Sequence, residues 1–229
     1  MVARCANQKL DALQPVAYQL AAVPRSFHSN NYHPMSFTRI GLTGGIAAGK
    51  SSVAELWRAH GATIIDSDVL AHRALERGTA TYREIVAAFG AAILNFDGTI
   101  NRRQLGEIVF ADAARRQALN AIVHPVVRAN WQRELAAATG IAVVVIPLLF
   151  EVGAEKEFDR VVVVGCSEAT QLARLVAKGL PAAQARARIQ AQLPLPAKMD
   201  RGNFVIWNDG SRAVLHQQAE IVWTKIKES

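Results

Sequence analysis

One stretch of the sequence combines the residue types that bind a phosphate chain. Residues 44–51 read Gly-Gly-Ile-Ala-Ala-Gly-Lys-Ser and fit the pattern G-x-x-x-x-G-K-[ST]. In such a loop the backbone N–H groups close around phosphate oxygens, the lysine reaches the β- and γ-phosphates, and the serine hydroxyl binds Mg²⁺. We therefore expect an ATP site with Ser51 on the metal. The expected nucleotide-binding residues are Gly44, Gly45, Ile46, Ala47, Ala48, Gly49, Lys50, Ser51 and Ser52.

The segments on either side of this loop support the interpretation. Residues 39–42 form a short apolar run of buried-strand type, and Val53, Leu56 and Trp57 recur behind the loop at helical spacing. The loop thus joins a strand to a helix, whose positive N-terminal end favours an anion. Chance register is the alternative, expected on the order of once in a hundred chains of this length at average residue usage.

Two carboxylates follow the second expected strand. Residues 62–66 form another apolar run, which ends in Asp66-Ser67-Asp68. Because ligands of an open α/β sheet gather at the carboxyl ends of its strands, Asp66 and Asp68 should lie near the phosphate loop. For Asp68 a functional role is one interpretation, and capping of a helix that begins at Val69 is the other. The two roles can coexist.

The rest of the chain must supply the sheet that positions these groups. β-branched runs at 141–146 and 160–164, with a last strand at 203–207, indicate parallel strands buried on both faces. We predict an α/β fold, a three-layer parallel-sheet P-loop NTPase core, closed by a helix that Ser211 caps. Residues 69–140 are helical almost throughout and too long for a simple crossover, which predicts a helical insertion for the second substrate.

A basic segment follows the fourth expected strand. No acid occurs between Glu168 and Met199, and the basic residues there are Arg174, Lys178, Arg186, Arg188 and Lys198. Arg174 and Lys178 share a helix face, whereas Arg186 and Arg188 point to nearly opposite sides. A breaker at 178–181 makes the segment a hinged helical flap, the predicted lid. A solvated basic surface is the alternative, which the charges alone leave open.

Composition limits the class of protein. The chain has 229 residues, of which 51% are hydrophobic and 20% charged, enough for one sizeable α/β core with insertions. A net charge of +7 suits a protein that handles polyanions. We expect no nucleic-acid partner, because no Lys/Arg run is interleaved with aromatic residues, and no membrane, because no apolar run approaches the length of a span. Two distant cysteines, Cys5 and Cys166, favour a reducing, cytoplasmic location. The oligomeric state stays open, with a monomer favoured.

Residues 1–35 differ from the rest of the chain. They are basic and nearly free of acids, and residues 24–34 are rich in Ser, Asn, His and Pro. Such a composition predicts a mobile tail, or an upstream start codon with Met35 as the functional one. A targeting peptide is a further alternative, although no clear apolar region or cleavage site follows the basic start. The folded domain is expected to span 36–229.

Six short motifs occur in a recognisable order. They are Thr43-Gly44-Gly45-Ile46-Ala47-Ala48-Gly49-Lys50-Ser51, Ile65-Asp66-Ser67-Asp68, Arg102-x-x-Leu105 with Val109-Phe110-Ala111-Asp112, His124-Pro125-x-x-Arg128, Pro147-Leu148-Leu149-Phe150-Glu151 and Val205-Ile206-x-Asn208-x-Gly210. From about Thr38 to the C-terminus the chain resembles the dephospho-CoA kinase family, which catalyses the last step of coenzyme A synthesis. The phosphate loop alone would be generic, whereas the His-Pro and Pro-Leu-Leu-Phe-Glu motifs make the resemblance specific.

The resemblance implies a role for each matched residue. Asp68 would be the general base that takes the proton from the ribose 3′-hydroxyl of dephospho-CoA. Lys50 and its loop would hold ATP, and Arg174, from a lid at 170–200, would reach the transferring phosphate. The insertion at 69–140 would bind CoA. The family positions around the acceptor pocket fall on Arg102, His124, Arg128 and Glu151.

The chain departs from the family pattern at three places. Asn101 and Asn203 stand where the family often has Asp, and Ala47-Ala48 stands where Gly-Ser is frequent. Asn203 leaves open whether that position makes an adenine-side or a structural contact.

A different P-loop small-molecule or nucleoside kinase is the nearest alternative function. A regulatory GTPase would need Asp-x-x-Gly and Asn/Thr-Lys-x-Asp motifs, which do not occur, and a nucleic-acid-binding ATPase is supported by charge alone.

Overall fold

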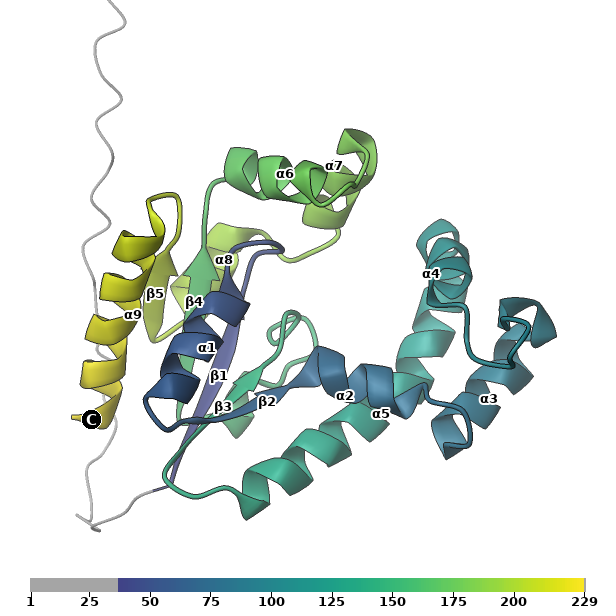
Figure 1. The fold of residues 1–229 in the computed structure, drawn as a ribbon, viewed down its shortest axis with the longest axis horizontal. Coiled ribbons are helices and arrows are strands. Elements are labelled where there is room, and N and C mark those ends of the chain that lie inside the picture. Colours follow the sequence, from purple (N-terminus) through teal and green to yellow (C-terminus); the bar gives the residue numbers. More distant parts are fainter. Residues whose placement is uncertain (1–36, 229) are drawn as a thin grey trace, which may run out of the picture.

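A five-stranded parallel sheet lies at the centre of the fold (Figure 1). The computed structural model describes residues 37–228, so the predictions for residues 1–35 fall outside the described part. The strand order is β2-β3-β1-β4-β5, and every neighbouring pair is parallel. The predicted α/β class is confirmed. The strands are β1 (Thr38–Gly44), β2 (Thr63–Asp66), β3 (Ile141–Val145), β4 (Arg160–Gly165) and β5 (Phe204–Trp207).

Residues 37–228 contain nine helices besides the sheet. They are α1 (Lys50–Ala59), α2 (Ser67–Ala74), α3 (Ala80–Phe89), α4 (Arg102–Ala111), α5 (Ala113–Ala137), α6 (Glu168–Ala177), α7 (Ala182–Gln190), α8 (Leu195–Arg201) and α9 (Arg212–Lys227). Two 3₁₀ turns, η1 (Ala91–Ile93) and η2 (Glu155–Glu157), lie between them. Within the same residues no helix has both the length and the apolar character to cross a bilayer.

Both faces of the sheet are buried, as the continuous β-branched runs predict. Along β3, Val143 belongs to the core under α1 and α9, whereas Val144 belongs to the core on the opposite face. On the first face Trp57 of α1 packs against Trp223 of α9, with ring centroids 5.8 Å apart. The Trp57 indole N–H donates to the Ala219 carbonyl at 3.0 Å, so this buried polar atom is satisfied.

The helices between β2 and β3 project from one side of the sheet, at the right of Figure 1. The 25-residue helix α5 runs through them and contacts α2, α3 and α4. Pro125 lies inside α5, whereas proline is favoured in the first turn of a helix. The helix continues because Val123 and Val127 are buried on either side, and their packing outweighs the lost backbone hydrogen bond.

Helices α6 and α7 lie at the top of Figure 1, over the end of β1 and the start of α1. Residues 178–181 separate them, as the predicted breaker requires. After α7 the chain returns to the sheet, where α8 contacts β1 and β4. The C-terminal helix is also confirmed: Ser211 caps α9 by accepting a hydrogen bond from the Val214 N–H.

Candidate active site

The phosphate loop joins β1 to α1 at the carboxyl edge of the sheet. Two of its glycines are required by geometry: Gly44 has φ 142°, and a Cβ there would lie 1.9 Å from the Val164 carbonyl oxygen. Gly49 precedes α1 with φ 105°, in the left-handed region that glycine tolerates. Ala47 has φ 57°, the one non-glycine residue in residues 37–228 with positive φ. The Lys50 ammonium closes the loop by donating to the Gly45 carbonyl at 2.9 Å.

Side chains from two other segments hold this loop. Asn208, buried just after β5, donates from Nδ2 to the Ala48 carbonyl at 2.7 Å. Arg174 of α6 donates to the Ala47 carbonyl at 3.1 Å and to the Asn208 carbonyl at 2.9 Å. The predicted lid arginine therefore links α6 to the phosphate loop and to the end of β5.

A cavity of about 470 Å³ opens at the same edge of the sheet, within the usual size range of small-molecule sites. It brings together groups from five segments far apart in the sequence: the phosphate loop with the start of α1, the start of α2, the end of β3, α6, and the turn from β5 into α9. The predicted residues that line it include Lys50, Ser51, Ser52, Asp68 and Arg174. Lys178 lines it as well, so the predicted shared face of Arg174 and Lys178 is confirmed.

The two aspartates after β2 have different roles. Asp66 is the N-cap of α2: its Oδ1 accepts from the Asp68 N–H at 2.8 Å and from the Val69 N–H at 3.3 Å. The alternative in which Asp68 caps a helix beginning at Val69 is therefore wrong, since the helix begins at Ser67 and the extended backbone of Asp66 suits the cap position. Asp68 lines the cavity.

Burial and neighbouring charges shift the two central ionisable groups. Burial raises the pKa of Asp68, the Asp66 charge adds to this, and Lys50 and His72 oppose it. Burial also lowers the pKa of Lys50 to about 8, with a further contribution from the Lys198 charge. A carboxylate with a raised pKa in a cavity beside a phosphate loop has the properties of a general base.

We expect the acid limb of kcat/KM against pH to lie above 3.8, because Asp68 must be ionised to accept a proton and its pKa is raised above that value. Asp66→Asn should move this limb to lower pH, since it removes a charge that raises the pKa, while asparagine keeps the helix cap. The pH profile of each variant gives the answer. Asp112→Asn, at the N-cap of α5, is the matched control. A limb that stays in place in Asp66→Asn would rule out this coupling.

The four residues predicted around the acceptor lie outside the lining of the 470 Å³ cavity. Arg102 and the pair His124 and Arg128 are exposed on the insertion, on α4 and α5. Arg128 makes an ion pair with Glu157 at 2.5 Å. Glu151 follows β3, pairs with a lysine of α8 and accepts from the Leu193 N–H at 2.9 Å. Among the described residues that line the 470 Å³ cavity, none of these four occurs.

The departures at Asn101 and Asn203 have structural explanations. Asn203 accepts from the Val161 N–H at 2.8 Å and donates its own N–H to the Val161 carbonyl at 2.8 Å. This pair extends the sheet at the beginning of β4 and β5, the end opposite the phosphate loop, so the contact is structural. Asn101 caps α4 by accepting from the Gln104 N–H, which asparagine and aspartate do about equally well.

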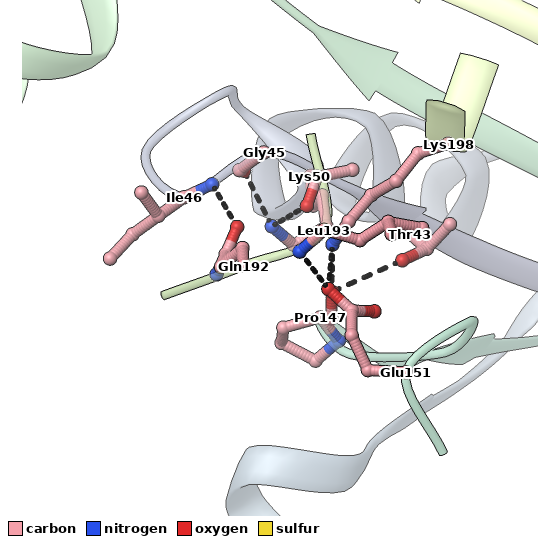
Figure 2. A network of polar contacts seen from close by, with 10 residues as sticks. Thr43, Gly45, Ile46, Lys50, Pro147, Glu151, Gln192, Leu193 and Lys198 are labelled. Atoms are coloured by element: carbon pink, nitrogen blue, oxygen red, sulfur yellow. Dashed lines mark hydrogen bonds and ion pairs between the residues drawn. The ribbon is translucent and has the colours of Figure 1, made fainter. Parts of the chain in front are cut away.

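Two residues near the site were not singled out by the sequence. Lys198, predicted as one of several basic residues of the flap, is fully buried in α8. Gln192 accepts from the Ile46 N–H of the phosphate loop at 3.1 Å (Figure 2). The only sequence signal for Lys198 is its place on the same helix face as Leu195 and Met199, which pack on the core. For Gln192 no pattern exists, since the contact joins segments far apart in the sequence.

Comparison with known proteins agrees with this geometry. A family model described as dephospho-CoA kinase matches residues 38–213. Dephospho-CoA kinase of Geobacter sulfurreducens is 44% identical over 191 residues, covering 81% of this chain and 97% of the relative. That of Arabidopsis thaliana is 42% identical over 193 residues, covering 82% and 83%.

Solved structures are similar along most of the chain. A Thermus thermophilus crystal structure has a TM-score of 0.72 at 35% identity and covers 85% of this chain and 98% of its own. Dephospho-CoA kinase from Campylobacter jejuni has a TM-score of 0.58 at 26% identity and covers 84% and 99%. With the family model matching most of the sequence, the chain belongs to the dephospho-CoA kinase family.

Proposed function

We propose that this protein transfers the γ-phosphate of ATP to the ribose 3′-hydroxyl of dephospho-CoA, giving CoA and ADP. Family membership supports the reaction. One structural observation supports the site: a single cavity is lined by a phosphate-loop lysine, a carboxylate with a raised pKa and a lid arginine. Phosphoryl transfer needs in-line positioning and neutralisation of charge rather than covalent catalysis, and these groups supply both.

Nucleotide binding is assigned to the phosphate loop. Its N–H groups and the Lys50 ammonium would contact the phosphates, and the positive end of α1 favours the same anion. Mg²⁺, when bound, would neutralise charge on the β- and γ-phosphates. The residues fit such a cation, because the Ser51 hydroxyl and two carboxylates, all hard oxygen ligands, line one cavity. We assign Ser51 to it.

Proton transfer is assigned to Asp68. Once the 3′-hydroxyl lies within hydrogen-bond reach, the ionised carboxylate accepts its proton as the oxygen attacks phosphorus. Arg174 would stabilise the charge on the transferring phosphoryl group and exchange its hydrogen bonds to the Ala47 and Asn208 carbonyls for bonds to phosphate oxygens. Closure of the lid over both substrates would keep water from the phosphoryl group.

The acceptor is assigned to the helical insertion between β2 and β3. Arg102, His124 and Arg128 lie exposed there, and partial burial lowers the pKa of His124. The charges of Arg102 and Arg128 complement the phosphates of dephospho-CoA, and Glu151 would bound the same pocket from the loop after β3. A monomer suffices for this site, because one chain contributes every proposed catalytic group. The cytoplasm is the proposed compartment, supported by the two widely separated cysteines.

A coupled assay of ADP release tests the reaction. The full chain is incubated with Mg²⁺-ATP and dephospho-CoA, beside adenosine, AMP and no acceptor, and the product is identified as CoA. We expect turnover only with dephospho-CoA. ADP release with a different acceptor would replace the acceptor assignment with another kinase activity, and release without any acceptor would contradict transfer to a hydroxyl.

A further inference from the structure

A fully buried lysine lies behind the phosphate loop. The Lys198 side chain is 0% exposed, and its Nζ lies 2.7 Å from Glu151 Oε1 and 3.1 Å from the Pro147 carbonyl oxygen (Figure 2). Lysine is almost never fully buried unless it is paired, because removing the ammonium from water costs more than most single contacts return. Two apolar residues of similar volume are often at least as stable as a buried ion pair. The Glu151 side chain is still 22% exposed, so the cost of burial falls mainly on Lys198, and this cost points to a use beyond stability.

The Pro147 carbonyl receives two donors from different elements. Lys198 of α8 is one, and the Oγ1 of Thr43 is the other, at 3.3 Å. Thr43 is fully buried and directly precedes Gly44, the first glycine of the phosphate loop. Pro147 itself lines the cavity together with Asp68. The shared carbonyl thus fixes a wall of the cavity relative to the end of β1.

The Glu151 carboxylate connects the same lysine to the base of the lid. It accepts from the Leu193 N–H at 2.9 Å, and the preceding residue, Gln192, accepts from the Ile46 N–H of the phosphate loop at 3.1 Å (Figure 2). Two consecutive residues between α7 and α8 therefore contact two different segments, the phosphate loop and the loop after β3. The Lys198 ion pair holds the Glu151 end of this connection in place.

We propose that Lys198 is a positioning residue for phosphoryl transfer, which holds the loop after β3 against the phosphate loop through the Pro147 carbonyl and the Glu151 carboxylate. Its side chain is not part of the cavity lining, so it acts through these groups and does not touch substrate. The role rests on the proposed function. A purely structural lysine is the competing explanation.

The loop after β3 has a second attachment to α8, which makes a Lys198 variant informative. Arg201 forms an ion pair with Glu155, and its guanidinium carbon lies 4.4 Å from the centre of the Phe150 ring. Loss of the Lys198 contacts should therefore loosen Pro147 and Glu151 while the loop stays docked at Glu155. The phosphate loop keeps its own hydrogen bonds, including that from Asn208.

Lys198→Met tests the proposal, because it keeps the chain length and removes the charge, the ion pair with Glu151 and the hydrogen bond to the Pro147 carbonyl. We expect kcat/KM for the acceptor to fall by about tenfold or more, while the ATP dissociation constant stays within about threefold, the pattern of lost alignment. Lys198→Arg, which keeps the charge, should recover part of the loss. Lys156→Met removes an exposed lysine of η2 and is the matched control. Thermal melting checks that each variant is folded.

Thr43→Val provides an independent variant if Lys198→Met does not fold. It removes the other donor to the Pro147 carbonyl, and we expect a fall of about threefold or more in the same parameter, again with ATP affinity retained. Unchanged kcat/KM in the folded variants would overturn the proposal, as would equal losses of turnover and ATP affinity. The unaltered chain is assayed with each acceptor in parallel. If it uses another acceptor, the proposed function fails, and the same comparison is made with that acceptor.

Discussion

Asp68→Asn is expected to lower kcat by about 10²-fold or more, while the ATP dissociation constant stays within about threefold, the usual scale for a positioned general base. Asparagine matches the shape of aspartate but cannot accept the proton of the 3′-hydroxyl. The cap of α2 does not depend on this side chain, because Asp66 supplies it. Single-turnover rates and equilibrium binding of ATP, measured on the same preparation, separate the two effects.

Asp112→Asn is the matched control for Asp68→Asn. It makes the same chemical change at the N-cap of α5, where asparagine also caps well. Its turnover should equal that of the unaltered protein. Near-normal turnover in Asp68→Asn would remove Asp68 as the base, and a loss of ATP affinity as large as the loss of kcat would assign it to nucleotide binding instead.

Arg174→Ala is expected to lower kcat by about 10²-fold or more, with a smaller effect on ATP affinity, because a guanidinium on the transferring phosphoryl group acts mainly in the transition state. Some weakening of ATP binding should accompany it, since the guanidinium would also bond phosphate oxygens of bound ATP before transfer. Arg174→Lys should recover little, as an ammonium cannot reproduce two parallel donors. Steady-state kinetics and ATP titration measure both quantities.

Arg186→Ala is the matched control in the same flap. Arg186 is exposed on α7 and does not belong to the cavity lining, so its replacement should leave kcat and KM unchanged. A pure binding defect in Arg174→Ala, with normal kcat at saturating ATP, would count against a role in the transition state. An effect of Arg186→Ala equal to that of Arg174→Ala would point to the general charge of the flap.

Much of the fold could be predicted from the sequence, because burial and backbone preference leave a pattern in each segment by itself. Every strand of the sheet appears in the sequence as an apolar run, since strands buried on both faces must be apolar throughout. Tertiary structure decides two features that local patterns leave open. Asp66 and Asp68 are both good caps, and only the backbone conformation selects Asp66. Pro125 looks like a helix start, but the buried Val123 and Val127 extend α5 through it.

The candidate site could be predicted only in part, for a similar reason. The phosphate loop and Asp68 sit at ends of strands, and the order of parallel strands brings such ends together. Lys198 could not be recognised, because its burial depends on Glu151, a residue of a different segment. The roles of Arg102 and His124 depend on how the insertion meets the acceptor, which spacing along a helix does not encode.

The central position of β1 has a consequence for the order of folding on the ribosome. Ile40 pairs with Val143 of β3 on one side and with Arg160 of β4 on the other, so both partners emerge about a hundred residues or more after β1. Until then the apolar segment that forms β1 has no strand to pair with, and exposed segments of this kind are bound by chaperones. Contacts among α2, α3, α4 and α5 are closer in sequence and can form first. The phosphate loop therefore takes shape late in synthesis, and ATP stabilises only a nearly complete chain.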